Sequence, residues 1–220
     1  MPASFPNSPR LLKGGIVLLD PANSAVQRII ALQYNPDTLT RSFQVQAFSG
    51  GNANDRSEAL RIKAPPVESI KLDVEIDATD QLEFPDQNPN AAQLGIHPQL
   101  AALETLLYPT SDQLQSNNAL AQAGTLEIAP MEAPLTLFIW SQKRIVPVRL
   151  TEFSVTEEAF DAVLNPIRAK VSLGLRVLSV EDLGFEHKGG RLYMAYQQQK
   201  EQLARLSTGA FATLGIGGIP

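Results

Sequence analysis

Asp73, Glu75, Asp77 and Asp80 form the densest group of chemically competent side chains in this sequence. Because side chains alternate along a strand, a spacing of two places the first three carboxylates on one face of a sheet. Such clusters bind calcium or act as general acid and base. A solvated sheet face whose charges prevent aggregation has the same pattern, and we favour that interpretation.

The histidines and a second acidic group offer little more for catalysis. Only two histidines occur, so a Ser-His-Asp triad would have to use His97 or His187. A proline follows His97, which predicts a helix-capping or exposed position, and a nearby glycine pair predicts a solvated loop around His187. We expect Glu157, Glu158 and Asp161 to be solvated acids in a loop between strands. The chain has no cysteine, which excludes disulfides and thiolate metal sites. We therefore predict no catalytic residue, no metal and no cofactor.

Glycines and aromatic residues suggest two further kinds of binding site. The run from Gly215 to Gly218 lacks the full dinucleotide-binding spacing and the flanking strand and helix, so it does not predict a phosphate site. Trp140 or Tyr34 would serve a binding module by stacking on a sugar or base. The surrounding Leu-Phe-Ile-Trp is more typical of a core or a barrel rim.

The composition limits the class of protein. The chain has 220 residues, 44% of them hydrophobic, which is enough for a sizeable core. With 18 Lys and Arg against 23 Asp and Glu, the net charge of −5 disfavours nonspecific binding to nucleic acid or to an anionic membrane. We expect neither a signal peptide at Met1–Pro6 nor a membrane-spanning helix, because no apolar run is long enough. The absence of cysteine is compatible with synthesis in the cytoplasm.

Seven stretches predict strands from their alternating or strongly apolar sequence. They are residues 16–19, 26–34, 39–47, 69–77, 135–140, 145–155 and 168–180. The turn after residue 19 predicts a hairpin, and Asn35-Pro36 and Asn165-Pro166 predict tight bends that begin strands. In the strand 39–47 we expect the face of Leu39, Phe43 and Val45 to be buried.

Helices and loops complete a mainly β (β+α) fold, an antiparallel β barrel or sandwich with one inserted helix and a C-terminal helical tail. The inserted helix begins at His97 and ends before Pro109, after a long excursion over residues 81–96. We expect polar loops at 49–61 and 111–124 and a tail helix at 191–206. The predicted division is a leader (1–13), a β-barrel domain (14–185) and a helical tail (186–220).

Six segments in this order resemble one known family. They are Ile29–Leu39, Ile70–Asp80, His97–Pro109, Pro134–Trp140, Val146–Phe160 and Leu164–Leu173. Together, over residues 14–182, they resemble the N-terminal domain of tube-type baseplate proteins from phage-tail-like contractile injection systems.

The resemblance implies a tail-tube-like barrel, six copies of which close into a ring. It implies a baseplate adaptor or tube-initiating ring whose partners are the spike, the inner-tube subunits and wedge or sheath proteins. Many relatives carry a C-terminal LysM module. Residues 191–220 are too short for that module and lack its Gly-Asp-Thr-Leu-like start, so sugar binding is not carried over.

Two residue sets follow from this interpretation. In a ring that passes cargo, the charged side chains Lys71, Asp73, Glu75 and Asp77 are expected to face the lumen. Leu192, Tyr196, Leu203 and Leu206 lie along one side of the predicted tail helix, where we expect partner contacts. We also expect the loops 49–61 and 111–124 to contact neighbouring layers.

Three alternatives stay open. The chain would instead be the inner-tube subunit itself, polymerising in many copies. From another class comes a monomeric β-barrel binding module for oligosaccharide or single-stranded nucleic acid, using Trp140 or Tyr34. A metal-dependent hydrolase using Asp73 to Asp80 ranks third.

Overall fold

Seven strands form a single antiparallel sheet in the computed structural model, which describes residues 11–21, 23–47, 61–124 and 133–219. The strands are β1 (Gly15–Leu19), β2 (Val26–Ala31), β3 (Leu39–Ala47), β4 (Ile62–Asp77), β5 (Leu135–Ser141), β6 (Arg144–Phe160) and β7 (Pro166–Val177). Their order is β2-β1-β5-β6-β7-β4-β3, so β2 and β3 are the edges. The predicted mainly β, antiparallel architecture is confirmed.

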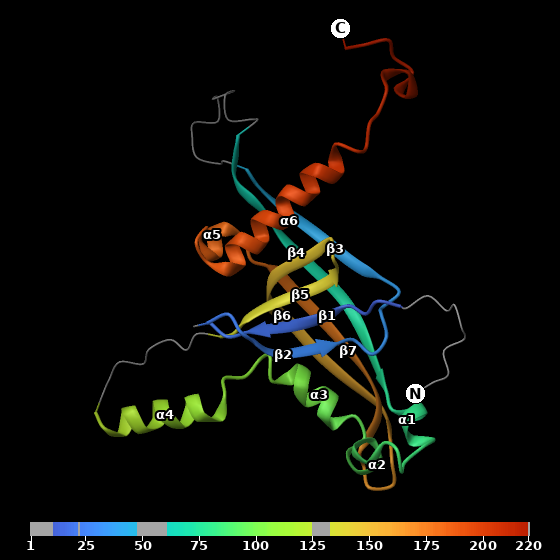
Figure 1. The fold of residues 1–220 in the computed structure, drawn as a ribbon, viewed down its shortest axis with the longest axis vertical. Coiled ribbons are helices and arrows are strands. Elements are labelled where there is room, and N and C mark those ends of the chain that lie inside the picture. The colour runs from blue at the N-terminus through green and yellow to red at the C-terminus, as the bar shows by residue number, and fades with distance from the viewer. Residues whose placement is uncertain (1–10, 22, 48–60, 125–132, 220) are drawn as a thin grey trace.

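The sheet curls around a main hydrophobic core, and Leu19, Leu135 and Leu137 form a second, smaller buried cluster. In Figure 1, β1, β2 and β5 cross in front of the long strands β4 and β7. Ile16 of β1 therefore joins Val74 of β4 and Val171 of β7 in one buried cluster. The apolar alternates predicted for β4 and β7 are all buried, at Ile70, Leu72, Val74, Ile76, Ala169, Val171, Leu173, Leu175 and Val177.

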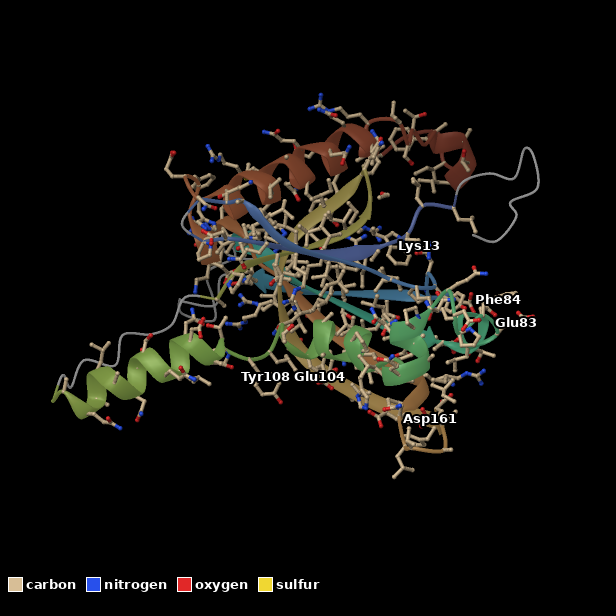
Figure 2. All side chains as sticks on the ribbon, turned by 60° about the horizontal axis from the view of Figure 1, so that its bottom comes forward. Lys13, Glu83, Phe84, Glu104, Tyr108 and Asp161 are labelled. Atoms are coloured by element: carbon tan, nitrogen blue, oxygen red, sulfur yellow. The ribbon has the colours of Figure 1, made fainter. Side chains whose placement is uncertain are left out.

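Helices cover the core from two sides. They are α1 (Thr79–Leu82), α2 (Pro89–Leu94), α3 (His97–Glu104), α4 (Ser111–Gln122), α5 (Val180–Leu183), α6 (Lys188–Ala204) and the short 3-10 helix η2 (Phe211–Leu214). The helix α3 buries Leu100 and Leu103, and α6 buries Tyr193 and Tyr196. Figures 1 and 2 both place α3 and α6 on opposite sides of the strands.

The described part of the connection between β4 and β5 holds four helices where the sequence predicted one. The predicted helix at His97 is confirmed, but the excursion over 81–96 contains α2 and the end of α1. The predicted loop at 111–124 is wrong, because most of it is α4. Thr110 accepts a hydrogen bond from the Gln113 backbone, and the Gln113 side chain accepts one from Thr110, which is a capping box. This local signal starts a helix that lacks an apolar stripe.

Two strand predictions also need correction. The strand β4 begins at Ile62 and includes both prolines, because near its start it pairs only with the edge strand β3. The predicted buried face of β3 is largely exposed, since Phe43 is 47% and Val45 is 69% exposed. Both residues lie on an edge strand, and the side chains of Arg41 and Lys200 lie over the Phe43 ring at 4.9 and 6.0 Å from its centre. The predicted loop at 49–61 lies almost wholly outside the described residues.

The helix α6 begins at Lys188, three residues earlier than predicted. His187 is its N-cap and accepts a hydrogen bond from the Gly189 backbone at 3.1 Å, so the predicted solvated loop is wrong there. Gly189 and Gly190 lie inside the first turn of α6, close to Gly184 at the end of α5. A Cβ atom at Gly190 would lie 1.8 Å from the Gly184 carbonyl oxygen. Glycine here permits a close approach of two backbones.

Candidate assembly surfaces

A charged face covers the outer side of β4, β7 and β6. Lys71, Asp73 and Glu75 are exposed and Asp77 is half-buried, as expected from their alternation with the buried residues of β4. Because β4 pairs with β7, Asp73 lies opposite Ser172, Glu75 opposite Lys170 and Asp77 opposite Arg168. We call the exposed side chains of these three strands the charged face.

Opposite charges are paired across this face. Lys71 Nζ lies 2.7 Å from Glu152 Oε2, and Lys170 Nζ lies 3.3 Å from Glu158 Oε1. Ser172 donates a hydrogen bond to Asp73 at 2.6 Å. Exposed pairs of this kind contribute only about 0–1 kcal/mol each. Their main consequence is a polar surface on which charges of both signs are locally balanced.

Asp77 has the densest hydrogen bonding of the predicted acidic group. It accepts hydrogen bonds from the backbone and hydroxyl of Thr79, and Arg168 Nε donates to its Oδ2 at 2.7 Å. Burial alone would raise the pKa of Asp77, but the bonds from Thr79 and Arg168 outweigh it and lower this pKa below its ordinary value. The same contact raises the pKa of Arg168.

The predicted acidic groups do not converge on a metal. Among the described residues, no three His, Cys, Asp or Glu side chains are arranged to hold an ion. Glu157 and Glu158 belong to β6, so their predicted position in a loop is wrong, and only Asp161 lies in the turn. There Asp161 accepts hydrogen bonds from the backbones of Val163 and Asn165 at 2.8 Å.

A buried carboxylate that sequence reasoning missed lies at the junction of β3, β4 and α6. Glu68 is only 3% exposed, and Arg41 Nε donates to its Oε1 at 2.8 Å. The Tyr196 hydroxyl donates to the same oxygen at 3.3 Å, and Lys200 Nζ lies 3.7 Å from Oε2. We call these four residues the Glu68 cluster. Glu68 lies in register with the apolar core positions of β4, and this polar residue in an apolar row was the available signal.

The Glu68 cluster ties α6 to the sheet. Burial, followed by the negative charge of Glu68, raises the pKa of Tyr196. Burial lowers the pKa of Lys200, although Glu68 acts in the opposite direction. Lys200 Nζ also lies 4.3 Å from the centre of the Tyr196 ring. These contacts hold α6 against β3 and β4.

The four predicted partner residues lie in different environments, and the predicted helix end at 206 is wrong, because α6 ends at Ala204 and Leu206 follows it. Tyr196 is 5% exposed within the core, and Leu192 packs beside Leu19, Leu135 and Leu137. Leu203 and Leu206 are 46% and 80% exposed. Within this chain, Leu192 and Tyr196 contact the domain's own sheet, so Leu203 and Leu206 are the members left open to a partner.

The predicted aromatic and histidine positions do not form a site. Trp140 is half-buried, packs against the core and stacks on Phe138 with ring centres 6.0 Å apart. Tyr34 is 45% exposed. His97 is exposed at the start of α3, where Ile96 occupies the N-cap, so the predicted capping alternative is wrong.

Both edge strands present apolar side chains. On β2, Val26 and Ile29 are 59% and 68% exposed, and Phe43 and Val45 lie on β3. Within the described residues each edge strand has one neighbour, β1 or β4. Unpaired edges of this kind are templates for pairing with another chain.

The described residues contain no helix that is both long and apolar enough to span a bilayer.

Comparison with known proteins assigns the chain to a family. Residues 16–182, most of the chain, match the family model described as contractile injection system tube protein. A solved chain from the tail of an empty GTA particle with C6 symmetry aligns with 75% of this chain and 90% of its own length, at 11% identity and a TM-score of 0.31. No curated protein matches the chain. The family match is therefore the informative comparison, and it shows that the chain belongs to the contractile injection system tube proteins, a family of structural components.

Proposed function

We propose that this chain is the subunit of a hexameric baseplate ring that acts as an adaptor between the spike and the inner tube of a contractile injection system. The observation that carries the proposal is a single sheet whose two edges are partly apolar and have no further strand among the described residues, with a charged face between them. The family match adds that the chain is a tube-type component. On this proposal it has no catalytic role.

The edges provide the ring contact. The edge β3 of one copy would meet β2 of the next, which is a heterologous contact between different surfaces. Repeated heterologous contacts generate a closed ring when their rotation closes. Closure would also cover Val26, Ile29, Phe43 and Val45, all exposed in the single chain, and remove both unpaired edges.

In this ring the charged face lines the lumen, with Lys71, Asp73, Glu75 and Asp77 towards the cargo. The pairs Lys71–Glu152 and Asp77–Arg168 leave little unbalanced charge on it. A hydrated wall with balanced charge has no large apolar patch to retain a passing protein.

One feature supports an adaptor over a repeating tube unit. The helix α6 and the residues after it follow the region matched by the family model, and on this proposal Leu203 and Leu206 there contact wedge or sheath proteins. A stacked tube repeat would gain little from such an addition.

The second candidate is the inner-tube subunit itself, which membership of the contractile injection system tube proteins favours. A monomeric binding module for oligosaccharide or single-stranded nucleic acid has less support, because Trp140 packs against the core. On the adaptor proposal the chain is made in the cytoplasm and then assembled into the particle.

Light scattering and negative-stain imaging of the purified chain test the proposal. We expect rings of six chains that do not stack further. Long tubes of the purified chain would favour the inner-tube alternative. A monomer at all concentrations, together with intact sheathed particles in a host lacking the protein, would overturn both.

A further inference from the structure

The chain after Arg205 is an apolar segment without charged side chains. Residues 206–219 contain no Asp, Glu, Lys or Arg. Four of their large side chains, Phe211, Leu214, Ile216 and Ile219, are between 45% and 78% exposed. Figure 1 shows this segment leaving α6 and running away from the sheet. Exposed apolar side chains at this density are typical of an interaction segment.

An apolar groove of about 350 Å³ is lined by residues of the edge strand β2 and of α3. The helix α3 lies on the side of the strands opposite to α6 (Figures 1 and 2). One wall of the groove contains Ile30 of β2 and Leu32, which directly follows β2. The other wall contains Ala102 of α3, and the core residues Val74 and Ile76 also line the groove. At its rim Arg28 Nη1 donates to the Thr105 hydroxyl at 2.5 Å, so this charge is already hydrogen-bonded.

One buried polar atom beside the groove has no partner. Gln99 belongs to α3 and lines the groove, and its Oε1 is buried without a hydrogen bond among the described residues. An unpaired buried acceptor costs about 1–3 kcal/mol. A peptide backbone in the groove would bring N–H donors close to Gln99.

We infer that residues 207–219 of a neighbouring copy occupy the groove between β2 and α3. The inference rests on the proposed self-assembly and specifies how one copy holds the next. The segment and the groove match in chemistry, because docking would bury apolar side chains without removing a charge from water. Thirteen residues span at most roughly 40 Å when extended, which is enough to cross to an adjacent domain.

Mixed cross-linking tests this contact, because the chain has no native cysteine. One preparation carries Ala102→Cys in the groove, and a second carries Ile216→Cys in the segment. The two are mixed and oxidised. We expect a disulfide-linked heterodimer. The matched control replaces Ala102→Cys by Ala101→Cys, which is exposed on the same helix and does not line the groove. Equal yields for the two positions, or no heterodimer, would overturn the inference.

Binding of a labelled peptide with the sequence of residues 207–219 provides a second measurement. The receptor is the chain ending at Leu206, which lacks the segment but keeps α6. We expect saturable binding that Ala102→Glu weakens on the order of tenfold or more, because the carboxylate would have to lose its water. Ala101→Glu should leave binding unchanged. Equal binding by both variants would contradict the inference.

The ring itself separates this inference from the proposed function. The chain ending at Leu206 should give fewer rings than the full chain under the same conditions. Suppose that the shortened chain forms rings of six equally well, and that the mixed Ala102→Cys and Ile216→Cys variants of the full chain form no disulfide. The segment contact is then wrong and the adaptor ring stands. If the full chain forms no ring but cross-links through Ala102→Cys and Ile216→Cys, the ring is wrong and the segment contact stands.

Discussion

The side-chain amide of Gln33 forms two hydrogen bonds with the backbone of Asp77. Gln33 Nε2 donates to the Asp77 carbonyl at 2.6 Å, and the Asp77 N–H donates to Gln33 Oε1 at 3.0 Å. One side chain thus makes the pair of contacts that a neighbouring strand would make. It joins the segment after β2 to the end of β4, two regions that are far apart in the order of the sheet.

Replacing Gln33 with alanine should lower the free energy of unfolding by about 1–3 kcal/mol, because two partly buried backbone groups lose their partner. Urea denaturation followed by circular dichroism measures this. Gln44→Ala is the control, since Gln44 is exposed on β3 and its side chain makes no hydrogen bond within the described residues. Equal stability of the two variants would show that water replaces the amide at no cost.

Removing the buried carboxylate of the Glu68 cluster should be more harmful. We expect Glu68→Ala to cost about 3 kcal/mol of unfolding free energy, because Arg41 would remain partly buried without its partner. Glu152→Ala removes an exposed partner of Lys71 and should cost less than about 1 kcal/mol. The idea that burial gives this cluster its importance fails if the two substitutions cost the same.

Stability should depend on Asp77 in a defined direction with pH. Its pKa in the folded chain lies below its ordinary value of 3.8, so its contribution is present above that value and is lost as pH falls through the lower folded pKa. Asp77→Asn should therefore reduce the free energy of unfolding at neutral pH and have a diminishing effect below about pH 4. Urea titrations of both proteins across this range measure the difference. A difference that stays constant would contradict the assigned cause.

The cap of α4 should act locally. Thr110→Ala removes the side chain that accepts from the Gln113 backbone at 3.2 Å, which costs about 1 kcal/mol of helix stability. No residue of α4 is buried, so we expect faster hydrogen exchange in Ser111–Gln122 and little change in global unfolding. Ser111→Ala, next to the cap, serves as the control. A drop in global stability would mean that α4 packs on the domain.

Charge reversal tests the proposed lumen. Asp73→Lys combined with Glu75→Lys should leave the fold and the ring intact, because both side chains are exposed. Passage or loading of cargo should fall, since the face would become strongly basic. Electron microscopy compares ring formation by the double variant and the unmodified chain. The amount of cargo in purified particles compares loading. Unchanged cargo content with intact rings would remove these residues from the lumen.

The sequence alone determined the antiparallel sheet and most of its inward faces. Strict alternation in β4 and β7 leaves only one way to bury Ile70 to Ile76 and Ala169 to Val177, because a slip of one residue would turn the charged side chains inward. The charged face follows from the same alternation. Proline after His97 likewise fixed the start of α3.

Only the tertiary structure determined which distant residues contact each other and which apolar side chains are covered. Glu68 is tolerable in the core because Arg41, Tyr196 and Lys200 arrive from β3 and α6, and no local pattern records such long-range partners. Tyr196 and Leu203 share one face of α6, yet Tyr196 is buried and Leu203 is exposed, because only the earlier part of the helix packs on the sheet. Periodicity identifies an apolar face, whereas the path of the helix over the sheet determines how much of that face is covered.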